Sequence, residues 1–208
     1  SILVIASFFS SVAKAQEKHV LAEQIISDKR LDTVNAMAER LLEKGFNAGG
    51  GYPQVWIRDM NTFIETSCKV YNTDTIRQNL LTFYALQQPN GEIVDGYVLK
   101  GHVTWGDPNQ YTTDIDKSHV GFKNTVETDQ ETSLIQAFGK YIKATDDTSI
   151  LNEIIGGKSV RQRMAESVEY LLKNRYSDKY KLLTGATTQD WGDVQIEGGA
   201  TVDIDSNT

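Results

Sequence analysis

The stretch Tyr52-Pro53-Gln54-Val55-Trp56-Ile57-Arg58-Asp59-Met60 follows three consecutive glycines and precedes a helical pattern over residues 62–71. It places an indole, a guanidinium and a carboxylate at Trp56, Arg58 and Asp59. A guanidinium donates hydrogen bonds, a carboxylate accepts them from hydroxyls, and an indole stacks on the apolar face of a sugar ring. The stretch therefore indicates a site for a polyhydroxylated ligand. In the structural alternative, Asp59 caps the following helix and Arg58 pairs with it on the surface.

Apolar residues recur at three-and-four spacing on both sides of this stretch, which is typical of amphipathic helices. The pattern predicts helices over residues 16–44, 62–71, 75–87, 129–144 and 159–174, the first with a break near Ser27 and Asp28. Residues 91–126 lack this periodicity and are expected to form a long irregular loop, and a short extended segment is expected at 181–184. Alternating helices with almost no strand signal predict an all-α solenoid or toroid of helical hairpins.

The composition bounds the class of protein and its partners. Hydrophobic residues make up 39% of the chain and charged residues 24%, as in ordinary globular proteins. The net charge of -7 argues against a nucleic-acid binder, because phosphate binding draws on clustered Lys and Arg. Cys68 is the only cysteine, so no intrachain disulfide can form and the fold depends on packing.

The first residues are typical of a secretory signal. The apolar run Ile2 to Phe9 is too short to span a bilayer, and Ala13 and Ala15 have the small-x-small spacing of a signal-peptidase site. Residues 1–15 are therefore predicted to be the remnant of a signal peptide, which implies a secreted or periplasmic protein with no membrane association after signal removal. The alternative is a short buried helix. Residues 16–208 are expected to be the N-terminal portion of a single domain.

Two further groups of polar residues are candidates for ligand binding. Thr128 and Glu131 have capping-box spacing, which leaves Glu127 and Asp129 at the mouth of the predicted helix. Both are expected to support ligand binding. The stretch before them, residues 91–126, is rich in aromatic residues and contains Trp105, a candidate for stacking on a sugar.

The segment around Trp191 supplies carboxylates suited to proton transfer. Asp190 and Asp193 flank Trp191 and a glycine. A carboxyl group against an aromatic wall is desolvated, which raises its pKa and makes it a proton donor near neutral pH. The alternative is a turn in which both aspartates bond local backbone amides. The three histidines show no metal-ligand spacing, so no metal or cofactor is expected.

Together these stretches resemble the six-hairpin glycosidases, (α/α)6-toroid enzymes that include glucoamylase-like, trehalase-like, debranching-type and exo-mannosidase-type hydrolases. Residues 52–60 look like their Trp-x-Arg-Asp motif, which implies that Arg58 and Asp59 bind hydroxyls of the sugar in the cleaved subsite. Residues 190–193 resemble the Asp-Trp-x-Asp loops that supply a catalytic acid in several relatives. Residues 80–97 and 127–131 are similar to a helix-plus-loop and to the start of a later inner helix.

The resemblance implies inverting hydrolysis with a carbohydrate substrate. One carboxylic acid protonates the glycosidic oxygen while a carboxylate roughly 6.5 to 9.5 Å away activates water. Asp193 is the implied acid, with Asp190 as the second choice. The family toroid has twelve helices and about half can be drawn here, so the base is expected downstream of residue 208.

Two other classes of protein fit the same residues. A polysaccharide lyase of toroid type would use a base drawn from Tyr97, Tyr111, His102 or His119, although the acidic chain does not favour an anionic substrate. A non-catalytic carbohydrate-binding protein shares the tryptophans and the Arg-Asp clamp but does not need a carboxyl group beside Trp191. The released product separates the three: an inverted anomer, an unsaturated sugar, or nothing.

The substitution Asp193→Asn is expected to remove most hydrolysis of an unactivated glycoside in the full-length enzyme while leaving sugar binding largely intact. The amide cannot donate the proton that the leaving oxygen requires. Turnover followed by NMR of the released anomer, beside a sugar titration, checks this. Near-normal turnover would contradict the assignment.

Overall fold

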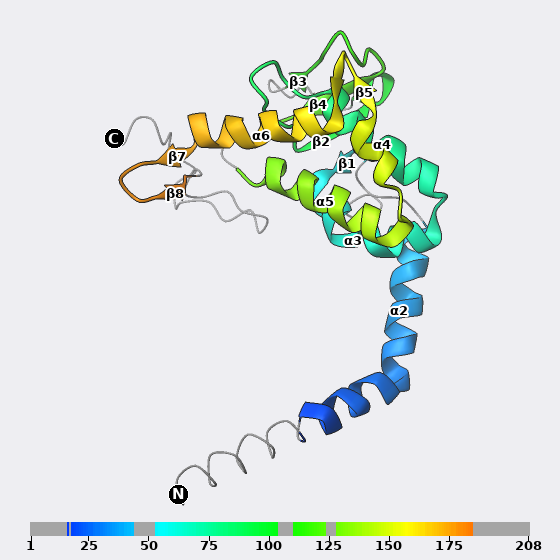
Figure 1. Ribbon diagram of the computed structural model, residues 1–208. Helices are drawn as coiled ribbons and strands as arrows, with labels where there is room; N and C mark the ends of the chain where they lie inside the picture. Colours follow the sequence, from blue (N-terminus) through cyan, green and yellow to red (C-terminus); the bar gives the residue numbers. More distant parts are fainter. Residues whose placement is uncertain (1–15, 17, 44–52, 104–109, 124–127, 185–208) are drawn as a thin grey trace, which may run out of the picture. The chain divides into compact units, whose positions relative to one another are not determined.

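The computed structural model describes residue 16 and residues 18–43, 53–103, 110–123 and 128–184 (Figure 1). The chain forms two compact units, Ser1–Leu41 and Leu42–Thr208. Helices are the main elements and small sheets accompany them, so the predicted helical character is confirmed at this coarse level. The predicted signal segment, residues 1–15, lies outside the described residues.

The described residues of the first unit, 16 and 18–41, are helical except at Asp28. Residues 18–27 are helical, Asp28 is not, and α2 (Lys29–Leu42) follows. Asp28 ends one helix and begins the next because its side chain accepts from the Arg30 amide at 3.0 Å and from the Arg30 guanidinium at 2.6 Å. The break predicted near Ser27 and Asp28 is confirmed.

Four helices form the body of the second unit: α3 (Ile57–Val70), α4 (Thr73–Ala85), α5 (Gln130–Thr145) and α6 (Val160–Asn174). All four were predicted from the apolar spacing, although α3 begins five residues earlier than expected. Their inward faces form one continuous core, in which the largest fully buried side chains include Tyr84, Phe83, Phe138, Tyr141, Ile64, Ile76, Leu80 and Leu134.

Helices α3 and α5 run parallel, side by side. Asn61 Nδ2 donates to Gln136 Oε1 at 3.3 Å, and Lys140 Nζ donates to the Asn61 carbonyl at 2.6 Å. One turn further along α3, Lys143 approaches Glu65 at 3.5 Å. Because the contacts advance in the same direction along both helices, the two N-termini lie at the same end of the pair.

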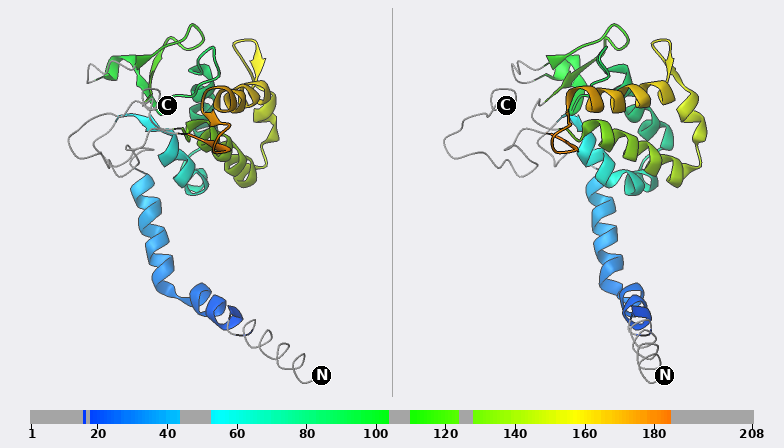
Figure 2. Two further views of the ribbon diagram at one scale, coloured as in Figure 1. Left: turned by 90° about the vertical axis from the view of Figure 1, so that its left-hand side faces the viewer. Right: turned by 60° about the vertical axis from the view of Figure 1, so that its left-hand side comes forward.

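Three strands of a four-stranded antiparallel sheet come from the stretch expected to be a loop. Its strand order is β1-β2-β4-β3, made of β1 (Val55–Trp56), β2 (Gly96–Leu99), β4 (His119–Phe122) and β3 (Gln110–Tyr111). Figure 2 shows the sheet to one side of the helices in both views. The prediction of a long irregular loop over residues 91–126 is wrong. Consecutive residues of β2 and β4 are buried on both faces, so the alternation that signals a strand is absent.

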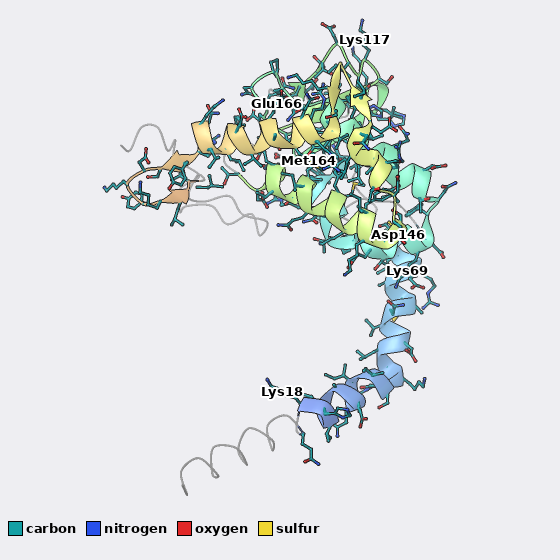
Figure 3. All side chains as sticks on the ribbon, viewed as in Figure 1. Lys18, Lys69, Lys117, Asp146, Met164 and Glu166 are labelled. Carbon is teal, nitrogen blue, oxygen red and sulfur yellow. The ribbon has the colours of Figure 1, made fainter. Side chains whose placement is uncertain are left out.

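Short elements complete the described part of the second unit. They are η1 (Lys100–His102), η2 (Thr148–Asn152), the hairpin β5 (Ile154–Ile155) and β6 (Lys158–Ser159), and the hairpin β7 (Tyr176–Ser177) and β8 (Leu182–Leu183). The last strand confirms the extended segment predicted at 181–184. Figure 3 shows Lys117 at the tip of the connection between β3 and β4.

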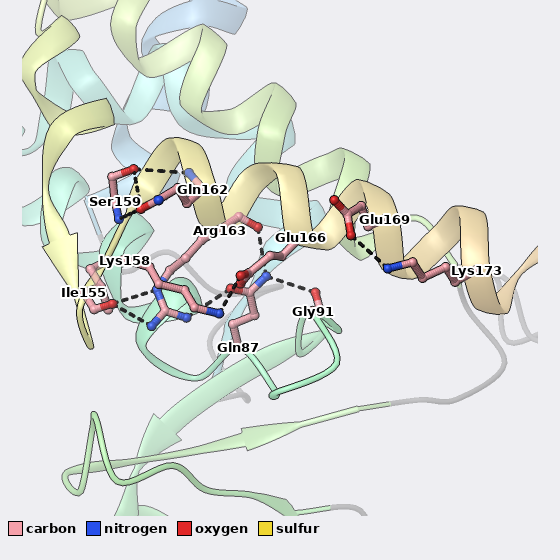
Figure 4. Close-up of polar contacts among 10 residues, drawn as sticks. All are labelled: Gln87, Gly91, Ile155, Lys158, Ser159, Gln162, Arg163, Glu166, Glu169 and Lys173. Carbon is pink, nitrogen blue, oxygen red and sulfur yellow. Dashed lines mark hydrogen bonds and ion pairs between the residues drawn. The ribbon is translucent and has the colours of Figure 1, made fainter.

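A buried polar network joins α6 to the turn after α4 (Figure 4). The guanidinium of Arg163 donates to the Ile155 carbonyl at 2.9 and 2.6 Å and to Gln87 Oε1 at 3.1 Å. Gln87 Nε2 in turn donates to the carbonyls of Gly91 and Arg163, each at 3.0 Å. Arg163 and Gln87 are both buried, so these bonds satisfy polar groups that water does not reach.

Replacing Gly91 by alanine is expected to lower the free energy of unfolding by at least about 2 kcal/mol. Gly91 has φ +100, and a Cβ there would collide with the carbonyl oxygen of Glu166. The control is Gly139→Ala, at an exposed position inside α5 with no atom within 4 Å of the added Cβ, which is expected to stabilise by roughly 0.5–1 kcal/mol. Urea unfolding measures both; a shift of the same sign in the two variants would contradict the prediction.

Candidate functional site

Arg58 and Asp129, which the sequence placed in two separate candidate stretches, meet in the structure. Arg58 is the second residue of α3, and Asp129 immediately precedes α5. Arg58 Nη1 lies 4.0 Å from Asp129 Oδ1. The Arg58 side chain is 25% exposed and that of Asp129 is 49% exposed, although the Asp129 Oδ1 atom is itself buried. The parallel packing of α3 and α5 brings these two helix starts together.

A pocket of about 320 Å³ lies at this pair. Its lining is formed by Arg58, Asn61, Thr62, Asp129 and Ser133. The lining offers one guanidinium, one carboxylate, one amide and two hydroxyls, a mixture of donors and acceptors that suits a neutral polar ligand. The pocket also lies at the N-terminal ends of α3 and α5, where each helix carries a partial positive charge.

A tertiary hydrogen bond sets where α3 begins. The Ile57 amide, the first of the helix, donates to the carbonyl of Asp95 at 2.8 Å. Trp56 precedes it in extended conformation as the N-cap and makes no side-chain cap bond. The sequence predicted a later start because Trp56 is not a favoured N-cap residue, and the acceptor at Asp95 is distant in the chain. The early start brings Arg58 into the first turn.

Asp59 is buried in the first turn of α3 and is 5% exposed. Burial raises its pKa, an effect that the backbone amide and the charge of Arg58 offset only in part. The structural alternative for Asp59 is wrong, because the N-cap is Trp56 and Asp59 does not lie on the surface. Among the described residues, the pocket lining includes Asp129 rather than Asp59 as the carboxylate beside Arg58.

Trp56 is half-buried against the sheet. Its ring centroid lies 6.5 Å from that of Phe122, at an interplanar angle of 40°. A Cβ on Gly96 would lie 2.6 Å from the indole atom Cε3, so only glycine admits the ring at this position. Stacking of the Trp56 indole on a sugar stays a prediction.

The start of α5 differs from the expected capping box. Asp129 is the N-cap and makes no side-chain cap bond, and Glu131 is fully buried. Glu131 Oε1 accepts from the Ile93 amide at 2.9 Å and lies 3.5 Å from Lys123 Nζ. The Thr128–Glu131 capping box is therefore wrong. Sequence reasoning also missed Lys123. The feature that could have indicated its burial is its position directly after the apolar end of β4.

The other predicted site residues lie outside the described residues. These are Trp105, Glu127, Asp190, Trp191 and Asp193. Their roles stay predictions, as does the proton transfer assigned to Asp193 or Asp190.

Two of the four residues named for a lyase base, Tyr97 and His119, are held in polar contacts away from the pocket. The Tyr97 hydroxyl donates to Asn79 Oδ1, and burial raises the pKa of Tyr97. His119 Nδ1 lies 2.7 Å from Asp116 Oδ2, in a turn where Asp116 also accepts from the amides of Ser118 and His119. Neither residue is among the described residues that line the pocket.

Within the described ranges, no group of three or more His, Cys, Asp or Glu side chains is arranged to hold a metal ion. The helices in the same part of the chain include none with the length and apolar character needed to cross a bilayer.

Comparison with known proteins found no matching family model, no matching curated protein and no matching solved structure. The geometry of the pocket is thus what bears on function.

Replacing Asp59 by asparagine is expected to stabilise the protein increasingly as pH rises above about 4, the usual Asp pKa. Because burial raises the pKa of Asp59, the folded state holds its proton to higher pH than the unfolded state. Ionisation through that window then lowers wild-type stability, and asparagine does not ionise.

Urea unfolding at a series of pH values measures this difference. The control is Asp114→Asn at an exposed position, expected to change stability by less than about 0.5 kcal/mol throughout. A constant difference between Asp59→Asn and wild type across the series would contradict the prediction.

Proposed function

We propose that this chain belongs to a secreted or periplasmic glycoside hydrolase and that the pocket between the starts of α3 and α5 binds a neutral sugar of its substrate. The observation that carries the proposal is the separation of 4.0 Å between Arg58 Nη1 and Asp129 Oδ1, in a pocket otherwise lined by an amide and two hydroxyls.

The separation favours a bridging hydroxyl. At 4.0 Å the two atoms are too far apart for a direct hydrogen bond, and an oxygen about 2.8 Å from each would bridge them once the buried Asp129 Oδ1 is uncovered. That oxygen must accept from the guanidinium and donate to the carboxylate. A hydroxyl does both, whereas a ligand carboxylate cannot donate and an ammonium cannot accept. Because the charges of Arg58 and Asp129 cancel, the pair gives no net attraction to a uronic acid, so it does not support the lyase alternative.

The helix arrangement supports the (α/α)6 toroid as the complete architecture. Helices α3 and α4 form one hairpin, α5 and α6 follow, and α3 and α5 are parallel neighbours. Repetition of such hairpins would put alternate helices in an inner ring, with their N-termini at one end. The pocket lies at that end of the α3–α5 pair.

In the proposed enzyme the pocket binds and orients the sugar. Arg58 and Asp129 fix one hydroxyl, and Trp56, Trp105 and Trp191 are the proposed stacking residues. Asp193 protonates the leaving oxygen, with Asp190 as the second choice, and a second carboxylate activates water. The product is the inverted anomer.

The substitution Arg58→Ala is expected to weaken binding of a neutral disaccharide by about tenfold or more, because a hydrogen bond from a charged donor is lost. Maltose, trehalose and α-1,6-mannobiose are the probes, titrated into the chain and followed by NMR. Turnover of the full-length enzyme is expected to fall together with binding.

The matched control is Arg161→Ala, which removes an exposed guanidinium from α6 and is expected to leave binding unchanged. Equal affinities of Arg58→Ala and wild type would contradict the proposal. Tighter binding of digalacturonate than of all three neutral probes would favour the lyase instead.

A further inference from the structure

We propose that the buried pair Lys123 and Glu131 are positioning residues that fix the separation of Arg58 and Asp129. The sugar-binding consequence rests on the proposed function, whereas the geometric consequence does not. Neither residue lines the pocket among the residues described.

Lys123 and Glu131 hydrogen-bond to both backbone polar groups of Ile93. Lys123 Nζ donates to the Ile93 carbonyl at 2.8 Å, and the Ile93 amide donates to Glu131 Oε1 at 2.9 Å. Lys123 Nζ also donates to Gln130 Oε1 at 3.1 Å and lies 3.5 Å from Glu131 Oε1. The side chains are 1% and 0% exposed, so water does not compete for these bonds.

Ile93 connects to both sides of the pocket. On one side, Gln130 and Glu131 are the first two residues of α5 and directly follow Asp129. On the other side, the carbonyl of Asp95, two residues after Ile93, accepts from the Ile57 amide next to Arg58. Residues 93–95 therefore join the start of α3 to the start of α5, and Lys123 and Glu131 hold the α5 half of that connection.

Stability alone does not account for this pair. Replacing a buried ion pair with apolar side chains of similar volume is often neutral or stabilising, because burying the charges is costly. In the described part of the chain Glu131 Oε2 has no hydrogen-bond partner, so the cost is not fully offset. Unlike apolar side chains, Lys123 and Glu131 make directional hydrogen bonds to Ile93. These bonds fix where Ile93 lies relative to the start of α5.

The test compares Lys123→Met with Arg77→Met. Arg77 makes a second ion-pair network, with Asp147 at 3.1 Å and Glu153 at 2.5 Å, that includes neither helix start at the pocket. Both variants are expected to lose stability. Only Lys123→Met is expected to shift the NMR signals of the Asp129 amide and the Arg58 Nε–H, and to weaken binding of the best-bound neutral disaccharide of maltose, trehalose and α-1,6-mannobiose by about tenfold.

A double variant, Lys123→Met with Glu131→Gln, keeps the test decisive if the single variant fails to fold. It removes both charges at nearly constant volume, so stability is expected to recover in part. The bond from Lys123 to Ile93 is still absent, so the signals of Asp129 and Arg58 stay shifted. The double variant thus distinguishes an effect on pocket geometry from an effect on stability.

Two results would overturn the proposal. One is that the NMR signals of the Asp129 amide and the Arg58 Nε–H shift no more in the Lys123 variants than in Arg77→Met. The other is wild-type signals in the double variant. If wild type binds none of the three disaccharides, the proposed function fails, and the NMR comparison still decides whether Lys123 and Glu131 position the pocket.

Discussion

The hydrogen bond from the Ile57 amide to the Asp95 carbonyl is the constraint on which the pocket depends. The first amides of a helix lack partners within the helix, so the start of α3 is set by whatever acceptor meets it. Here the acceptor belongs to a segment that also bonds to β4, since the Asp95 amide donates to the Phe122 carbonyl at 2.7 Å. These two bonds fix the start of α3 against the sheet. Because Arg58 directly follows Ile57, its backbone position is fixed with them.

Sequence periodicity was a good guide to the helices and a poor one to the strands. The apolar rows of α4, α5 and α6 repeat over several turns, so three-and-four spacing located them and the residues that face the core. Strands β2 and β4 are short, contain Gly96 and Gly121, and are buried on consecutive residues. Neither length nor alternation was there to reveal them, because each strand has four residues and three consecutive ones are buried.

The same distinction applies to the pocket. Local chemistry singled out Arg58 and Asp129, since both belong to polar stretches that begin predicted helices. It did not show that they face each other, and it assigned Glu131 to a local cap although its partners are Ile93 and Lys123. A buried charge is recognised only through its tertiary surroundings, and capping-box spacing arises readily without a cap.

The opposite charges of Arg58 and Asp129 have a consequence for what the pocket distinguishes. A bridging hydroxyl leaves the local net charge at zero, so electrostatic attraction from a distance contributes little to capture. Selection then falls on the direction in which the hydroxyl leaves its ring, because only one orientation reaches both partners. Axial and equatorial epimers, which carry the same atoms and the same charge, would present that oxygen differently, so under the proposed function the pocket would distinguish them.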